Sequence, residues 1–196
     1  VGNKALKDAE VKRNNNRSIQ FEEISLKDAM AKAKKENRLI FIDAYTDYCQ
    51  VLDEDKQNKE ALLMRAYIYV LRRDYPAARI DYNRLLELDP QSYSGRLGLA
   101  TLEQKEGKFR EALEILNKML AATPEDATLY IARADVEREM KHEDLALVDL
   151  EEAIRLDAAS ADAYLLRGNI YLAQKKKGLA KADFEKAISL GVPPAD

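Results

Sequence analysis

The sequence has very few of the residues that build catalytic and metal centres. It contains one cysteine, Cys49, one histidine, His142, and no tryptophan among 196 residues. A single cysteine excludes an intramolecular disulfide, and these two residues alone provide no Cys/His cluster for zinc. The net charge is only −3, from 32 basic and 35 acidic residues, so no strong field gathers nucleic acid. The composition therefore predicts no cofactor, no metal and no nucleic-acid partner.

Long hydrophobic runs are also missing. The apolar stretch 62–71 is interrupted by an arginine and is far shorter than the ~20 residues that a membrane span needs. What is present is 46% apolar and 34% charged residues, a balance typical of soluble, helical proteins. The chain begins with Val1 and not with methionine, which suggests either a recombinantly expressed segment or a processed chain. We expect a soluble protein without membrane insertion, and the sequence does not decide between cytoplasm and periplasm.

A period of 34 residues runs through most of the chain. The segment DYNRLLELDPQ, which starts at Asp81, aligns without gaps with three later segments at steps of 34 residues. Small or branched apolar residues recur in three rows of this period: Ala78, Ala112, Ala146 and Ala180; Ala66, Ala100, Ala134 and Gly168; and Leu86, Leu120, Ile154 and Ile188. Helices approach closely only where side chains are small, and larger apolar residues nearby fill the layer between them.

Each unit of the period is predicted to form two antiparallel helices. In the first unit these are KEALLMRAYIYVLRR and DYPAARIDYNRLLELDP, with Pro90 at the end of the second helix. The pattern resembles the tetratricopeptide repeat family, whose signature has small residues at the helix crossing, alanine in the second helix and a proline near the end of the unit. The matching units are 59–92, 93–126, 127–160 and 161–194. The turn glycine of the family is present only as Gly107, and Ala158 replaces the proline of the third unit.

The resemblance implies an all-α fold. We expect an α-solenoid of stacked antiparallel helix hairpins, a superhelix with four clear units and a degenerate one at the N-terminus. Such arrays usually bury a continuous core between neighbouring units. The resemblance also implies that the first helices line a concave surface for protein or peptide recognition.

Charged residues follow the same period. Arginine occupies the seventh position of three units and aspartate the twenty-third position of the same units: Arg65 and Asp81, Arg133 and Asp149, and Arg167 and Asp183. The second unit has Leu99 and Ile115 instead. Because the charges occur together and are absent together, the pattern predicts one ion pair inside each of the three hairpins. We interpret these pairs as structural and not as ligand-binding.

Residues 21–49 allow two interpretations. The segment FEEISLKDAMAKAKKENRLIFIDAYTDYC resembles the start of a thioredoxin-like domain, in which an apolar strand leads to the redox cysteine. That chemistry needs a second cysteine three residues further on, and Leu52 stands there. One period before the first unit, however, DYCQVLDEDKQ aligns with DYNRLLELDPQ, which places Cys49 at the position of Asn83.

We therefore expect a degenerate capping hairpin over 25–58, in which residues 39–45 are helical. Its first helix has Leu26, Ala29, Met30 and Ala33 on one face. The apolar run LIFI favours a strand instead, so a thioredoxin-like remnant stays the alternative. Residues 1–24 are predicted to be an N-terminal segment that is partly disordered or a frayed helix.

The family resemblance implies a set of peptide-contacting residues on the first helices. Carried over position by position, the set is Leu63, Met64, Tyr67, Val70, Leu97, Thr101, Gln104, Ile131, Asp135, Arg138, Leu165, Asn169 and Leu172. Because most of these side chains are apolar, we expect an apolar or amphipathic peptide, which Asp135, Arg138 and Asn169 orient through polar contacts. The protein is expected to be a non-enzymatic binding scaffold.

Two other functions stay open at this point. The chain can serve as a self-assembly or structural module whose groove is filled by its own segment, or it can be the remnant of a thioredoxin-like thiol protein fused to repeats. We also expect the last hairpin to leave Leu172, Phe184 or Ile188 partly bare, which gives a route to homo-oligomers. The identity of the partner, and whether the chain is a fragment of a longer protein, do not follow from the sequence.

Overall fold

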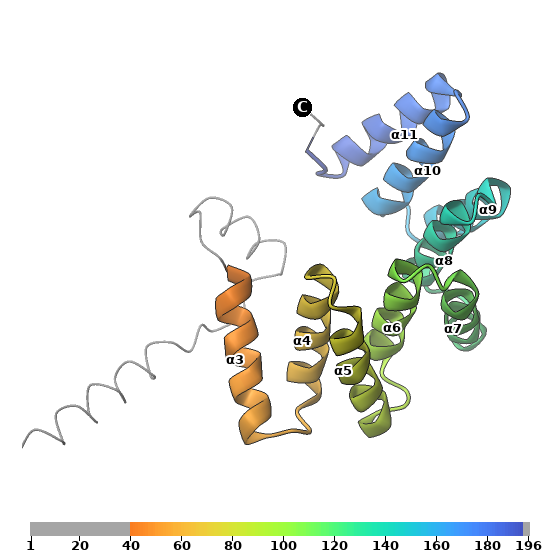
Figure 1. Ribbon diagram of the computed structural model, residues 1–196. Coiled ribbons are helices and arrows are strands. Elements are labelled where there is room, and N and C mark those ends of the chain that lie inside the picture. The colour runs from red at the N-terminus through yellow and green to blue at the C-terminus, as the bar shows by residue number, and fades with distance from the viewer. Residues whose placement is uncertain (1–39, 194–196) are drawn as a thin grey trace, which may run out of the picture. The chain divides into compact units, whose positions relative to one another are not determined.

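A computed structural model describes residues 40–193 of the chain (Figure 1). Within this range there are nine helices and no strand. They are α3 (Ile40–Glu54), α4 (Lys59–Leu71), α5 (Tyr75–Leu88), α6 (Tyr93–Lys105), α7 (Phe109–Ala122), α8 (Ala127–Glu139), α9 (Glu143–Leu156), α10 (Ala161–Ala173) and α11 (Lys177–Ser189). The predicted segment 1–24 and the first helix of the predicted 25–58 hairpin lie outside the described residues.

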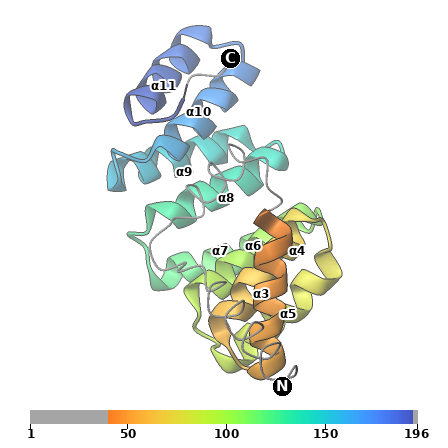
Figure 2. The same cartoon turned by 90° about the vertical axis from the view of Figure 1, so that its left-hand side faces the viewer.

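The chain divides into two compact units, residues 1–47 and 48–196. In the second unit, each helix from α4 to α11 packs against the next in the chain (Figures 1 and 2). The first helices of successive hairpins, α4, α6, α8 and α10, also contact one another in that order. The predicted all-α solenoid of stacked hairpins is therefore confirmed.

The helices begin where the sequence provides capping side chains. Asn58, Asp74 and Ser92 each accept a hydrogen bond from the backbone N–H three residues further on. Asp126 accepts from the N–H groups of Thr128 and Leu129. These bonds satisfy backbone donors that the first turn of a helix leaves free.

The turn inside each hairpin has one residue with positive φ. These residues are Arg73, Gly107, Lys141 and Lys175, with φ between 61° and 76°. After each of them the next N–H bonds to a carbonyl five residues back, at distances of 2.8 or 2.9 Å, which ends the first helix in a left-handed cap. All four hairpins therefore share the turn geometry that the sequence signals with glycine only at Gly107.

The small-residue rows form the centre of the array. Ala66, Ala78, Ala100, Ala112 and their later equivalents are buried. One cluster joins Ala100 and Leu116 to Leu129 of the following hairpin, and another joins Ala134 and Leu150 to Ile170. The core thus continues from hairpin to hairpin, as expected for a solenoid.

The helix α3 bears on the two interpretations of the opening segment. The thioredoxin-like alternative needs a strand at LIFI, whereas the described residues of that run, from Ile40 onward, are helical. The capping hairpin over 25–58 stays a prediction. Further along α3, Tyr48 and Leu52 pack against Ala61 and Leu62 of α4. These are the contacts that a second helix makes with the following hairpin, because Leu52 stands one period before Leu86.

Candidate functional site

The three predicted ion pairs lie inside their own hairpins, as expected. Each arginine donates from Nε and Nη2 to both oxygens of its aspartate. The two distances are 2.7 and 2.8 Å for Arg65 and Asp81, 2.8 and 2.7 Å for Arg133 and Asp149, and 2.9 and 2.8 Å for Arg167 and Asp183. All three aspartates are buried, and the hydrogen bond to the aspartate raises the pKa of each arginine. Bidentate geometry makes these pairs specific as well as strong.

Cys49 lies at a position of the period that contacts the arginine of the following hairpin. In the third hairpin the contact is a hydrogen bond, because Arg133 also donates from Nη1 to Asn117 Oδ1 of the preceding hairpin, at 2.7 Å. Cys49 and Asn117 occupy the same position of the period, and Arg65 Nη1 lies 3.9 Å from Cys49 Sγ. The half-buried thiol therefore faces a guanidinium that already binds Asp81. This arrangement places Cys49 where another hairpin has an asparagine.

Several of the predicted peptide-contacting residues also serve the core. Leu63 and Val70 pack against the cluster around Ala66. Leu97 packs against the cluster around Leu116, and Ile131 packs against the one around Leu150. Met64 and Leu165 are half-buried. Packing between first helices thus occupies much of the apolar surface in the predicted set.

The exposed members of the set lie near the two ends of the array. Tyr67 on α4, and Asn169 and Leu172 on α10, are exposed. Leu71, one turn after Tyr67, is exposed as well. The first-helix face therefore presents apolar side chains at α4 and at α10.

Between these ends the first-helix face is polar. Gln104 is 7% exposed and donates from Nε2 to Asp135 Oδ2 at 2.7 Å and to Glu139 Oε1 at 3.0 Å. Arg138 donates from Nη2 to Asp135 Oδ1 at 2.6 Å. These bonds connect α6 to α8. Glu139 was missed by sequence reasoning because the other units have Leu71, Lys105 and Ala173 at its position, so no acidic residue recurs there.

The thirteen predicted residues therefore do not form one continuous apolar groove. Gln104, Asp135 and Arg138 are brought together, whereas Thr101 donates from Oγ1 to the carbonyl of Leu97, at 3.0 Å, on its own helix. Side chains already bonded to one another have fewer donors and acceptors for a ligand. The half-buried Asp135 and Arg138 keep the outer part of the network accessible.

A second inter-hairpin connection was also missed. Arg79 on α5 donates from Nη2 to Glu103 Oε2 on α6, at 2.9 Å, and also contacts Glu106. Lys108, and then Arg79, lower the pKa of Glu106. The equivalents of Arg79 in the next two hairpins are Leu113 and Leu147, so the period contains no signal for this pair.

Tyr82 of α5 lies over Gly98 of the next hairpin. A Cβ atom on Gly98 would come within 2.6 Å of Tyr82 Cζ, closer than side chains tolerate. Burial raises the pKa of Tyr82 to about 12, and the electrostatic interaction with neighbouring Tyr67 makes a smaller contribution to this rise. The absence of a side chain at Gly98 thus makes room for an aromatic ring at the junction of two hairpins.

Two properties of the described part of the chain bear on other functions. In residues 40–193 no group of three or more His, Cys, Asp and Glu side chains is placed to hold a metal ion. Among the helices in that range, none is both long enough and apolar enough to cross a bilayer.

Repeated hairpins with a continuous core define an α-solenoid, and comparison with known proteins identifies its family. Three models of the tetratricopeptide repeat family match, over residues 43–93, 73–136 and 161–190. The first match begins within α3. The chain belongs to the tetratricopeptide repeat family. These repeats are typically non-catalytic, and the fold indicates a protein-interaction or scaffold module.

Solved structures agree with this assignment. A tetratricopeptide repeat protein from Parabacteroides merdae is 34% identical, with a TM-score of 0.75; the match covers 82% of this chain and 62% of that protein, so this chain spans less than two thirds of it. The structure of pilF from Pseudomonas aeruginosa is 27% identical, with a TM-score of 0.60. That match covers 70% of this chain and 62% of pilF. A chain of the Cut9–Hcn1 hetero-tetramer of APC/C shares the fold, at 16% identity and a TM-score of 0.69. The match covers 76% of this chain and 29% of that chain. No curated protein matches the sequence significantly.

Proposed function

We propose that the protein is a non-enzymatic scaffold that binds a peptide segment of a partner protein along its first-helix face. The observation that carries this proposal is the division of that face. Exposed Tyr67 and Leu71 on α4 and Leu172 on α10 supply apolar contacts, and the network of Gln104, Asp135, Arg138 and Glu139 lies on the helices between them.

The division supports an amphipathic ligand. A rigid network positions hydrogen-bonding groups without further loss of side-chain freedom, which favours orientation of a bound peptide. Tyrosine and leucine side chains gain free energy when a ligand removes them from water. A peptide with apolar residues at both ends and polar groups in the middle fits both requirements.

The test uses residues taken from the repeat itself. Tyr67 and Leu172 are replaced by Thr and Gln, which Thr101 and Gln104 provide at the same positions of the second unit. The intact array captures a partner from cell extract, and the affinity of that purified partner is then measured for Tyr67→Thr/Leu172→Gln. We expect binding at least about tenfold weaker with unchanged helicity by circular dichroism. Undiminished binding to the variant would contradict the use of this face.

A second candidate function is self-association through the last hairpin. Leu172 and Ile188 are exposed, whereas Gln104 and Leu120, at the same positions of the second unit, are buried. A second copy gains free energy by covering these exposed apolar side chains. Light scattering gives the molar mass of the intact chain and of Ile188→Lys. If the chain dimerises through this end, the variant should have the mass of a monomer, whereas a dimer through another surface should keep its mass.

A further inference from the structure

The outer face of α9 differs from the same face of α7. Leu145 and Val148 are 55% and 63% exposed. One period earlier, α7 has Glu111 and Glu114 at these positions, as a solvent-facing helix surface usually does. Residues three apart lie next to each other on one helix face. Leu145 and Val148 therefore form an apolar strip on the side of the hairpins opposite to their first helices.

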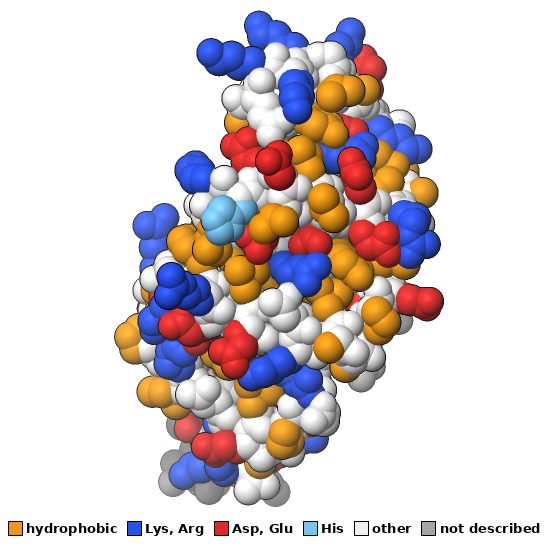
Figure 3. All heavy atoms as spheres, turned by 90° about the vertical axis from the view of Figure 1, so that its right-hand side faces the viewer, with side chains coloured by type: hydrophobic (Ala, Val, Ile, Leu, Met, Phe, Trp, Pro, Cys, Tyr) orange, Lys and Arg blue, Asp and Glu red, His pale blue; other side chains and the backbone are white. Residues whose placement is uncertain are grey.

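A hollow lies at the N-terminal end of this strip. It has a volume of about 590 Å³ and is lined by Lys141, His142, Glu143, Asp144, Leu145 and Gln174. Because Leu145 belongs to both, the strip and the hollow form one surface. His142 is already engaged, since its Nδ1 lies 2.7 Å from Glu137 Oε2. Figure 3 shows hydrophobic side chains among charged ones on the face that also exposes the histidine.

Only the nitrogen of the Gln174 side-chain amide has a hydrogen-bond partner. Its Nε2 donates to Glu143 Oε2 at 2.9 Å, while its Oε1 is buried and has no hydrogen-bond partner. Reversing the amide would place Oε1 against the Glu143 carboxylate, so the oxygen is the unpaired atom. A buried acceptor without a partner costs about 1–3 kcal/mol.

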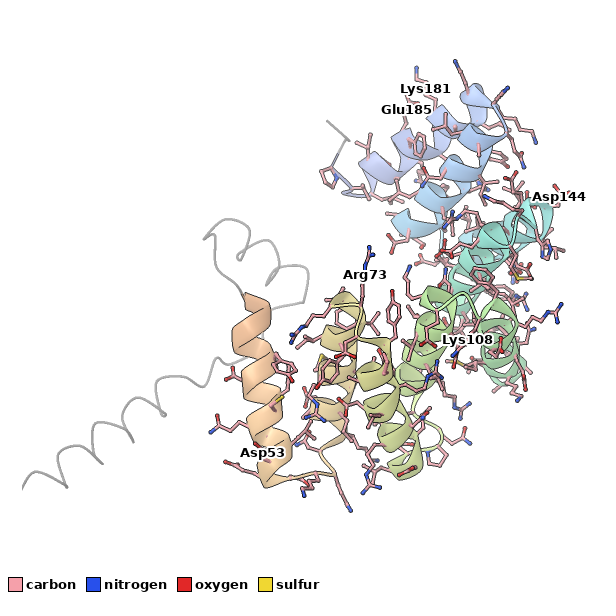
Figure 4. The ribbon with its side chains drawn as sticks, in the orientation of Figure 1. Asp53, Arg73, Lys108, Asp144, Lys181 and Glu185 are labelled. Carbon is pink, nitrogen blue, oxygen red and sulfur yellow. The ribbon has the colours of Figure 1, made fainter. Side chains whose placement is uncertain are left out.

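Negative charge flanks the strip. Asp144 projects from the first turn of α9 (Figure 4), and Glu151 lies two turns further on. Both are exposed, and neither has an ion pair within residues 40–193. Glu152, by contrast, is bonded to Arg155 at 2.8 and 2.6 Å. Lys141 is the lysine among the residues lining the hollow. The unpaired carboxylates favour a basic ligand and repel an anionic lipid surface.

We propose that the outer face of α9, defined as Asp144, Leu145, Val148, Glu151 and the adjoining hollow, docks a basic amphipathic helix of a partner protein. The apolar side of that helix covers Leu145 and Val148. Its arginine or lysine side chains pair with Asp144 and Glu151. The surface lies on a second helix, so it is separate from the first-helix face of the proposed function.

The probe is a synthetic helical peptide of about 16 residues, long enough to form a helix alone. It has leucines at i, i+3, i+4 and i+7 with arginines beside them, and its control has glutamates in place of the arginines. Binding to the full chain is measured by isothermal titration calorimetry and mapped by backbone amide chemical shifts. We expect the basic peptide to bind at α9 and the acidic peptide to bind at least about tenfold more weakly.

Two variants and one control test the residues. Leu145→Glu/Val148→Glu gives α9 the side chains that α7 has at the same positions and should weaken binding about tenfold or more. Gln174→Met introduces the residue that the preceding hairpin has at this position, Met140, and should change binding by less than about twofold, because the buried Oε1 does not reach the peptide. Ile80→Glu, at the same outer position of α5 and 69% exposed in the parent chain, should leave binding unchanged.

Three outcomes would overturn the proposal. They are equal binding of the acidic peptide, peptide-induced shifts confined to the first helices, and a self-association of the chain that Leu145→Glu/Val148→Glu abolishes, which would make a second copy the occupant. Circular dichroism confirms that each variant keeps its helicity.

Discussion

The second hairpin and the other three solve the same packing problem with different chemistry. In the first, third and fourth hairpins a buried aspartate receives two hydrogen bonds from an arginine. In the second hairpin Leu99 and Ile115 occupy the two positions, and both pack against apolar clusters. The hairpin fold is the same in all four. The two positions therefore require side chains that match each other, either two opposite charges or two apolar groups, and they do not require charge.

The largest effect should come from breaking one charged pair. Arg133→Leu leaves Asp149 buried without its cation, and removing one partner of a buried pair costs about 3–5 kcal/mol. Because Arg133 is partly exposed, we expect a loss of about 2–4 kcal/mol in the free energy of unfolding. Urea denaturation followed by circular dichroism measures it.

Replacing both partners sharpens the comparison. Arg133→Leu/Asp149→Ile transfers the pair of the second hairpin into the third and should differ from the parent by less than about 1 kcal/mol, since no unpaired charge remains. A double variant as unstable as Arg133→Leu alone would show that the third hairpin depends on the ion pair itself.

An intermediate effect is expected at the glycine of the second hairpin. Gly98→Ala introduces the residue that the third hairpin has at this position, Ala132, but here the new methyl group meets the ring of Tyr82. Overpacking of this kind costs about 1–3 kcal/mol. Adding Tyr82→Leu, which copies Leu116, should restore at least half of the loss in a thermal melt. No recovery would mean that the ring is not the cause.

The smallest effect concerns the turns. Gly107 has φ of 76°, and the other hairpins place Arg73, Lys141 and Lys175 in the same left-handed region. Gly107→Lys should destabilise by about 1 kcal/mol, because a side chain strains this conformation. Lys141→Gly should change stability by less than about 1 kcal/mol, since relief of strain is offset by the greater freedom of glycine when unfolded. A larger loss for Lys141→Gly than for Gly107→Lys would contradict this account.

The period accounts for what could be predicted about the site. Arg65, Arg133 and Arg167 were paired correctly because each shares its presence or absence with one aspartate. Tyr67 and Leu172 were placed on the first helices by the same register, and both are exposed. Their role in binding stays a prediction. Leu97 and Ile131 were assigned to the same surface, but they pack against core clusters, which a face assignment alone does not distinguish from exposure.

The sequence by itself determined the repeat, the helical hairpins and the pairs within them, because these features recur and every recurrence tests the alignment. Tertiary structure alone decided the contacts between unlike positions of neighbouring hairpins. Arg79 reaches Glu103, Gln104 joins Asp135, and Gln174 keeps an unpaired oxygen beside Glu143. Each of these depends on how one hairpin is offset from the next and on which side-chain conformation the offset allows. Each of these contacts occurs only once among the described residues, so the period of the sequence could not predict it.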